Sequence, residues 1–217
     1  MTVWLRILLF GAVGAIWIAA DRLEGSPAWD FVFIIGGPLA VYPIVWRGRR
    51  LIDREPVPAN ARAVTAGVHA AIMALYGAAV IKALALFSDW HGWTIALPRP
   101  VTDALFLATT IAMSLTVANL AIDAFGAPFA VALSRRLASG GFYRRTRNPM
   151  ALATIAWFVA IGLSLQSAAF VFWVVLVLTP AELEYLEVYE ERELEIRFGN
   201  DYLAYRAKTP FLLPRLA

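Results

Sequence analysis

The sequence predicts an all-α integral membrane protein with about six transmembrane helices and a C-terminal cytosolic helical segment. Hydrophobic residues occupy 60% of the 217 positions and charged residues only 16%, and the mean hydropathy is +0.66. These values are typical of membrane proteins. Apolar runs of roughly 20 residues recur along the chain, which is the length that a helix needs to cross a bilayer. Arginines gather in alternate loops, as they do on the cytoplasmic side of membranes.

The first four apolar runs form a predicted N-terminal region over residues 1–122. The predicted spans are 2–20, 31–46, 64–87 and 102–122. The first is interpreted as a retained transmembrane helix, with a cleaved signal peptide as a minor alternative. The loop over 47–62 is rich in arginine and is predicted to be cytoplasmic, whereas Trp90 and Trp93 in the loop over 89–100 suit the outer interface.

Four polar residues of the third and fourth spans have two interpretations each. Lys82 lies near the outer end of its span and is predicted to snorkel rather than to take part in catalysis. His69 lies near the inner end, where helix packing is a more common role than that of a base. Asn119 and Asp123 are four residues apart and share one helix face. They either cap the inner end of a site or join helices.

The remaining residues, 123–217, are predicted to form a helical hairpin and a cofactor-binding region. Asn148 followed by Pro149 predicts a helix start, because asparagine favours the N-cap and proline the first helical position. Arg144 and Arg147 precede this start, and the free N–H groups of a helix N-terminus attract anions. The combination predicts an anion site.

Two apolar arms follow, over 149–165 and 168–178, with a break at Gln166 and Ser167. Each arm approaches the thickness of a bilayer's hydrocarbon layer. Because consecutive spans are antiparallel, the second arm returns its continuation, 181–198, to the membrane face that carries the arginines.

This continuation is both acidic and periodic. The three-and-four spacing places one set of residues on a single helical stripe, namely Leu183, Leu186, Glu190, Leu194 and Arg197. Glu190 stands where an apolar residue is expected, and a carboxylate there needs a cation or a hydrogen-bond donor. For Glu190 and Glu191, a place in the site and a place on a solvated face are about equally supported. The other glutamates are interpreted as a solvated face, namely Glu182, Glu184, Glu187, Glu193 and Glu195.

This region resembles the C-terminal region of the isoprenylcysteine carboxyl methyltransferase and phospholipid methyltransferase family. The resemblance runs from Phe125 to Pro214. It rests on Gly141-Phe142-Tyr143, Arg147-Asn148-Pro149-Met150, the hairpin, Tyr189-Glu190-Glu191, Leu194, Phe198-Gly199, Tyr202, Tyr205 and Thr209-Pro210. The sequence departs from the family at Ala151 and Ala153, where Tyr and Gly are usual, and at Phe211, where Arg is common.

The resemblance implies a binding site for S-adenosylmethionine at the cytosolic membrane face, between the Arg-Asn-Pro motif and the glutamate pair. The implied cofactor-binding residues are Tyr143, Arg144, Arg147, Asn148, Pro149, Met150, Glu190, Glu191, Phe198, Tyr202 and Tyr205. The arginines are expected to hold the carboxylate of the cofactor and the glutamates its ammonium group. The aromatic residues after Glu191 are expected to flank the adenine.

The implied function is methyl transfer from S-adenosylmethionine to a lipid-borne or hydrophobic acceptor, either an isoprenylcysteine carboxylate or a phospholipid amine. Two alternatives remain open. One is an NADPH-dependent reductase of the sterol reductase type, which has a similar membrane segment with an Arg-Asn-Pro motif. The other is a non-enzymatic membrane scaffold. The sequence assigns no catalytic residue.

Composition narrows the chemistry further. The chain has no Cys and only two histidines, His69 and His91, which argues against thiolate nucleophiles, iron–sulfur clusters and multi-histidine metal centres. The expected partners are the lipid bilayer and a hydrophobic acceptor, and no nucleic acid. The expected location is an inner membrane of the bacterial type, or an equivalent, with both termini in the cytoplasm.

Overall fold

The computed structural model describes residues 3–23, 26–89, 92–124 and 133–214. Its helices are α1 (Val3–Arg22), α2 (Pro27–Arg54), α3 (Pro58–Asp89), α4 (Arg99–Ala124), the 3₁₀ helix η2 (Gly141–Arg144), α5 (Pro149–Ser164), α6 (Ala168–Trp173), η3 (Val174–Leu178), α7 (Thr179–Glu184), η4 (Tyr185–Glu190), α8 (Glu191–Phe198) and α9 (Asn200–Lys208). The elements from α6 to α8 continue as one helix, Ala168–Phe198, which we call the long helix. The predicted start of the family resemblance, Phe125, and His91 lie outside the described residues.

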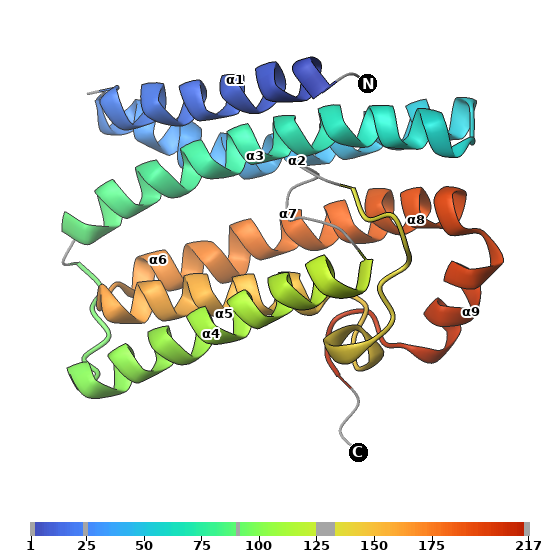
Figure 1. The fold of residues 1–217 in the computed structure, drawn as a ribbon. Helices are drawn as coiled ribbons and strands as arrows, with labels where there is room; N and C mark the ends of the chain where they lie inside the picture. The colour runs from blue at the N-terminus through green and yellow to red at the C-terminus, as the bar shows by residue number, and fades with distance from the viewer. Residues whose placement is uncertain (1–2, 24–25, 90–91, 125–132, 215–217) are drawn as a thin grey trace.

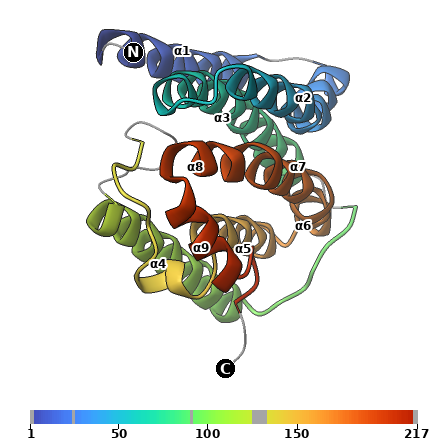
Figure 2. The same ribbon diagram turned by 90° about the vertical axis from the view of Figure 1, so that its right-hand side faces the viewer.

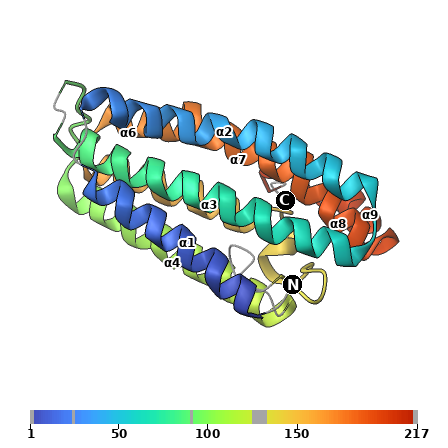
Figure 3. The same cartoon turned by 90° about the horizontal axis from the view of Figure 1, so that it is seen from above.

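The helices run side by side in two layers (Figures 1 and 3). In one layer α3 contacts α1 and α2, and in the other α5 contacts α4 and the long helix. The long helix joins the layers because it also packs on α2 and α3. Seen from the end in Figure 2, α9 lies beneath α8, close to η2.

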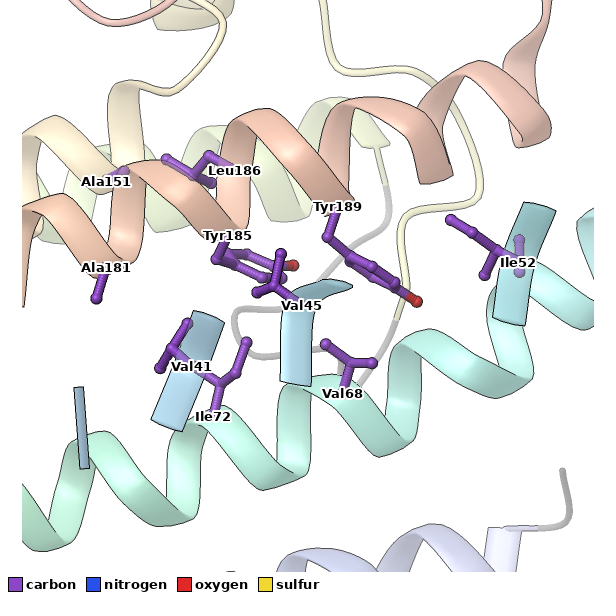
Figure 4. Packing of buried hydrophobic residues seen from close by; sticks show 11 residues of the cluster. Val41, Val45, Ile52, Val68, Ile72, Ala151, Ala181, Tyr185, Leu186 and Tyr189 are labelled. Atoms are coloured by element: carbon purple, nitrogen blue, oxygen red, sulfur yellow. The ribbon is translucent and has the colours of Figure 1, made fainter. Parts of the chain in front are cut away.

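An apolar cluster forms the contact between the two layers (Figure 4). Val41 and Val45 of α2 and Val68 of α3 meet Tyr185 and Tyr189 of the long helix. Val41, Val45 and Tyr189 are fully buried. A buried aromatic side chain of this size contributes strongly to packing, so this cluster holds the C-terminal half of the long helix against α2 and α3.

Four helices of the described residues are long and apolar enough to cross a membrane, namely α2, α3, α4 and the long helix. The prediction of an all-α membrane protein is therefore confirmed. Helix α5 is apolar but has only 16 residues. The count of six spans remains a prediction.

The predicted cytoplasmic loop over 47–62 is wrong in its extent. Helix α2 continues through Arg54 and α3 begins at Pro58, so the connection is a short turn. Arginines are good helix formers, and a helix can continue past the membrane surface when its last turns are solvated. The arginine-rich stretch therefore marks where α2 leaves the apolar region, and the helix itself ends later.

Lys82 does not snorkel to solvent, contrary to the sequence-based prediction. Its side chain is buried, its Nζ lies 3.0 Å from Asp30 Oδ1, and it donates a hydrogen bond to the carbonyl of Leu23. An intramembrane ammonium group needs such a partner. This pair could not be predicted from local sequence, because Asp30 lies on α2, far from Lys82 in the chain.

The turn between α5 and α6 lies where the break at Gln166 and Ser167 was predicted. The Ser167 hydroxyl accepts a hydrogen bond from Phe170 N at 3.2 Å, which is an N-cap for the long helix. Backbone hydrogen bonds join this turn to the loop before α4: Ala168 N donates to Trp93 O at 3.1 Å, and Ile95 N donates to Gln166 O at 3.0 Å. These two hydrogen bonds hold the turn of the hairpin against the loop before α4.

The long helix contains two π-helical turns, η3 and η4. A π turn closes its hydrogen bonds between residues five apart instead of four, and such turns are frequent at functional sites. Each π turn holds an extra residue. Helix faces that are assigned from the sequence at 3.6 residues per turn are therefore shifted beyond each π turn. This shift affects the acidic stretch after Leu178.

Candidate functional site

The hairpin brings Arg147 and Glu191 together, as its two antiparallel arms predict. Arg147 Nη2 and Glu191 Oε1 lie 2.8 Å apart, and the side chains are only 12% and 9% exposed. Arg147 precedes the first turn of α5, and Glu191 begins α8. Of the two glutamates that the sequence proposed for this position, Glu191 therefore pairs with Arg147.

A second arginine, Arg206 of α9, completes this ion-pair group. Its Nε lies 3.3 Å from Glu191 Oε2, and its guanidinium also contacts Glu195. The backbone carbonyl of Arg206 accepts a hydrogen bond from Arg147 Nη1 at 3.2 Å. Sequence reasoning missed Arg206, although its place one turn after Tyr202 on α9 puts both residues on one helix face.

Two buried atoms of this group have unused hydrogen-bonding capacity. Within the part of the chain that the structure describes, Arg147 Nε donates to no acceptor and Glu191 Oε1 accepts no hydrogen bond. The 2.8 Å contact between Nη2 and Oε1 is thus a close ion pair without the angle of a hydrogen bond. Buried polar atoms are nearly always paired, so these two fit a ligand with both an acceptor and a donor group.

Glu190 differs from its neighbour because no described residue forms an ion pair or a hydrogen bond with its carboxylate. Burial, and after it the negative charge of Glu190, raises the pKa of Tyr143 well above its usual range. Burial and then the charge of Glu191 raise the pKa of Tyr202, and Glu190 adds to this effect. Both tyrosines therefore keep their hydroxyl protons at physiological pH, and both lie near the glutamate pair.

The helix start at Pro149 is confirmed, but Asn148 does not cap it with its side chain. The Asn148 amide instead donates to the carbonyl of Phe211 at 3.0 Å, and the Thr146 hydroxyl donates to the same carbonyl at 3.2 Å. The backbone N–H of Arg147 donates to Pro210 O at 2.9 Å. The C-terminal tail therefore accepts hydrogen bonds from the residues just before α5, and it fixes the approach to this helix.

The Gly141-Phe142-Tyr143 stretch is held against the end of α4. Asn119 Oδ1 accepts a hydrogen bond from Phe142 N at 2.9 Å, and Asn119 Nδ2 donates to Asp123 Oδ2 at 2.6 Å. Gly141 has φ +54°, and a Cβ there would come within 2.6 Å of the Asn119 side chain. The pair on α4 thus joins two elements, which is one of the two roles that the sequence allowed.

Tyr205 of α9 closes the other side of this stretch. Its hydroxyl donates to the carbonyl of Tyr143 at 2.6 Å, and its ring centroid lies 6.3 Å from that of Tyr202. Tyr202 is fully buried. The two tyrosines therefore link η2 to α9 beside the ion-pair group.

Three other residues of the predicted site have different surroundings. Arg144 is exposed, and no contact with Arg147 or Glu191 is seen. Met150 is half-buried in the first turn of α5. Phe198 lies with its ring 4.7 Å from the guanidinium carbon of Arg197. The described contacts of Phe198 are thus to Arg197 and not to the tyrosines of α9.

Glu193 is not on a solvated face, contrary to the sequence-based interpretation. Its carboxylate pairs with Arg197 Nη1 at 2.8 Å, and the two side chains are 3% and 2% exposed. Arg197 also donates to the backbone carbonyl of Ser134, in the segment that leads to η2. The periodicity missed this pair because the π turns shift the faces of the long helix. The spacing of four residues between opposite charges was the available signal.

An open surface groove of about 310 Å³ lies elsewhere, between α4 and α5. It is lined by Asp103, Phe106, Trp157, Ile161, Ser164 and Leu165. None of these residues belongs to the ion-pair group. We place the candidate site at the ion-pair group because the charges and the buried atoms without partners are there.

Comparison with known protein families gives a match over much of the C-terminal half of the chain. Residues 101–201 match the model of a family described as phospholipid methyltransferase. The matched segment contains Arg147, Glu190 and Glu191, and it ends just before Tyr202, Tyr205 and Arg206 of α9. No curated protein matches the chain.

Proposed function

Since residues 101–201 match the model of the phospholipid methyltransferase family, we propose that the chain is an integral membrane methyltransferase that uses S-adenosylmethionine. The match to this family supports the assignment of a membrane methyltransferase that acts on lipid-like substrates. The use of S-adenosylmethionine and a lipid-borne or hydrophobic acceptor are the finer parts of the proposal. The observation that carries them is the buried ion pair of Arg147 and Glu191, with its unused donor and acceptor atoms.

The charges of the site suit the amino acid part of S-adenosylmethionine. We expect Arg147 to hold the carboxylate, because its buried Nε has no acceptor among the described residues and charge-assisted hydrogen bonds to carboxylates are strong. We expect Glu191 or Glu190 to hold the ammonium group. Glu190 has the greater need of a cation, because no described arginine or lysine pairs with it, whereas Glu191 has Arg147 and Arg206.

The aromatic residues of the site are expected to hold the adenine. Tyr202 and Tyr205 lie beside the ion-pair group on α9, and their hydroxyls stay protonated because burial raises the pKa of both side chains. Flat aromatic rings with a polar tip suit a heteroaromatic base. Phe198 belongs to this proposed set, although its described contact is with Arg197.

Methyl transfer depends mainly on the alignment of the two reactants, and it does not require a nucleophilic side chain. S-adenosylmethionine supplies an activated methyl group, and transfer is an in-line displacement by the acceptor. Holding the reactants in line and excluding water can lower the barrier by ~7–11 kcal/mol. The long helix and α5 run from the site into the apolar region, so the acceptor is expected to reach the site laterally from the bilayer.

Isothermal titration of the detergent-purified protein with S-adenosylmethionine tests the proposal. Arg147→Ala and Glu191→Gln should each weaken binding by roughly 30-fold or more, because each leaves a desolvated charge without its partner, at a cost of about 2–5 kcal/mol. Glu187→Gln is the matched control: it removes a glutamate of the same stretch that is exposed, and it should bind like the parent.

NADPH is titrated in parallel. Binding of NADPH instead of S-adenosylmethionine would replace the proposal with a reductase, and binding of neither would favour a scaffold. If both variants bind S-adenosylmethionine like the parent while they remain folded, the cofactor site lies elsewhere.

A further inference from the structure

Ion pairs connect the end of α2 to the candidate site in an unbroken series. Asp53 Oδ1 of α2 lies 2.8 Å from Arg192 Nε of α8. Arg192 Nη1 lies 3.1 Å from Glu195 Oε2, and the other oxygen of Glu195 pairs with Arg206 Nη1 of α9. Each charged group uses different atoms for its two neighbours. We call these four residues the ion-pair series.

The last residue of the ion-pair series, Arg206, contacts both Arg147 and Glu191. Its Nε lies 3.3 Å from Glu191 Oε2, and its backbone carbonyl accepts a hydrogen bond from Arg147 Nη1 at 3.2 Å. The side chain of Arg206 is 43% exposed, so burial alone does not hold it, and its ion pair with Glu195 fixes it beside the site. A displacement of α9 would therefore change the surroundings of Arg147 and Glu191 together.

Helix α2 holds the long helix by a second polar contact, which Arg49 makes. Its Nη1 donates a hydrogen bond to the carbonyl of Val188 at 2.8 Å, and its Nε pairs with Asp53 Oδ2 at 2.6 Å. Val188 belongs to the π turn η4 and precedes Glu190 by two residues. Arg49 and Asp53 are four residues apart and share one face of α2. This face therefore contacts both the turn before the glutamate pair and the ion-pair series after it.

We propose that α2 is part of the S-adenosylmethionine site, with Asp53 as a positioning residue that acts through Arg192 and Arg206. This inference rests on the proposed function, and it adds a helix that lies outside the matched family segment, residues 101–201. Binding is tighter when the groups of a site are already held in the bound geometry. While Asp53 holds Arg192, the ion-pair series holds Arg206, and less ordering remains to be done when the ligand binds.

The exposure of the ion-pair series determines how large its effect on binding is. The side chains of Asp53 and Arg192 are 38% and 31% exposed, and ion pairs at such positions contribute little to stability. Residues that share one network nevertheless alter each other's contributions. The expected effect of breaking the pair is therefore a modest loss of affinity, of about 3-fold to 5-fold.

A double-mutant cycle tests whether Asp53 acts through Arg206. The full chain in detergent is titrated with S-adenosylmethionine as the parent, as Asp53→Asn, as Arg206→Gln and as the double variant. Asp53→Asn should weaken binding by about 3-fold to 5-fold in the parent. In the Arg206→Gln background the same substitution should have no effect, because the residue through which it acts is already gone. Equal losses in the two backgrounds would overturn the proposal.

Glu55→Gln is the matched control. Glu55 is exposed two residues after Asp53, and its carboxylate forms no ion pair within the described residues. Its substitution removes the same charge from the same end of α2, and this variant should bind S-adenosylmethionine like the parent. A loss as large as that in Asp53→Asn would reveal a long-range effect of charge and would contradict the proposal.

A second measurement does not depend on the cofactor. Hydrogen exchange of the backbone amides of α9 reports how firmly this helix is held, and it should be about 3-fold to 5-fold faster in Asp53→Asn and unchanged in Glu55→Gln. If the parent binds no S-adenosylmethionine, the proposed function falls, while faster exchange in Asp53→Asn still supports the coupling of α2 to α9. If the parent binds it with an affinity that Asp53→Asn does not change, this inference falls and the proposed function stands.

Discussion

Two arginines of α8, Arg192 and Arg197, form ion pairs that differ in burial, and this difference sets the energetic weight of the pairs. Glu193 and Arg197 are almost completely buried, whereas Arg192 pairs with Asp53 and Glu195 in a position about one third exposed. A buried charge that loses its partner costs far more than an exposed one, because water cannot replace the lost contact.

At this scale we expect Arg197→Ala to lower the free energy of unfolding by about 3–5 kcal/mol, since it leaves the Glu193 carboxylate buried and unpaired. It also removes the hydrogen bond to the Ser134 carbonyl. Arg192→Ala, the exposed counterpart, should cost about 0–1 kcal/mol. Unfolding in mixed micelles of increasing SDS content measures both. Equal losses in the two variants would show that Arg197 does not stabilise the fold through this pair.

Part of the candidate site could be predicted from the sequence, because a helix start and a helical hairpin can both be recognised from local patterns. Arg147 and the glutamate pair were placed together by the helix start at Pro149 and the two arms of similar length. Arg206 and Glu193 were missed for different reasons. Arg206 lies on a short helix whose direction no local pattern gives, and Glu193 lies beyond two π turns that shift the helix faces.

At the scale of elements, η2 depends on close contact with α4. The Gly140-Gly141 turn lies so near Asn119 and Asp123 that side chains at either glycine would meet them at 2.6–2.7 Å. Gly141 also has a positive φ, which residues with a Cβ rarely adopt. This contact determines where Tyr143 and the following arginines lie.

Gly141→Ala should therefore displace η2 and lower the free energy of unfolding by at least ~1–2 kcal/mol, from backbone strain alone. Binding of S-adenosylmethionine should weaken with it, because Tyr143 moves. Gly67→Ala on α3 is the control, since a Cβ there meets nothing within 4 Å, and alanine in a helix is neutral or favourable by about 0.5–1 kcal/mol. Thermal unfolding and titration of both variants test this. An unchanged affinity in Gly141→Ala would separate η2 from the site.

Helix positions were largely predictable because apolar runs are long, whereas helix ends were not. The arginines after Trp46 were interpreted as a loop, yet α2 continues to Arg54. Polarity shows where a helix leaves the apolar region, and only backbone signals such as Pro58 show where a helix begins. The predicted division into regions 1–122 and 123–217 remains a prediction.

At the scale of the whole molecule, several exposed arginines lie at the end of the bundle that carries the candidate site, whereas Arg22 and Arg99 are exposed at the end of α1 and the start of α4. Arg50 and Arg54 at the end of α2, and Arg144 and Arg145 before α5, are exposed. Trp93 lies in the loop that pairs with the opposite end of the hairpin. A bias of arginine to one side predicts that this side is cytoplasmic.

Cysteine labelling can test this topology directly, because the chain has no native Cys. A cysteine at position 93 should react with an impermeant maleimide in intact cells. A cysteine at position 145 should react only after the membrane is opened. Both side chains are exposed, so a lack of reaction reflects sidedness and not burial. Reaction at 145 from outside would reverse the proposed orientation.

The hydrogen bonds from the tail to the start of α5 also constrain the order of events during synthesis. Asn148 and Thr146 find their partner at Phe211, 63 and 65 positions later in the chain. A ribosome therefore delivers the first turn of α5 to the membrane well before the backbone that fixes its approach exists. The last helix that is long enough to span the membrane ends at Phe198, so all the spans are synthesised before Phe211, and only then can the start of α5 and the proposed ligand site take their final form.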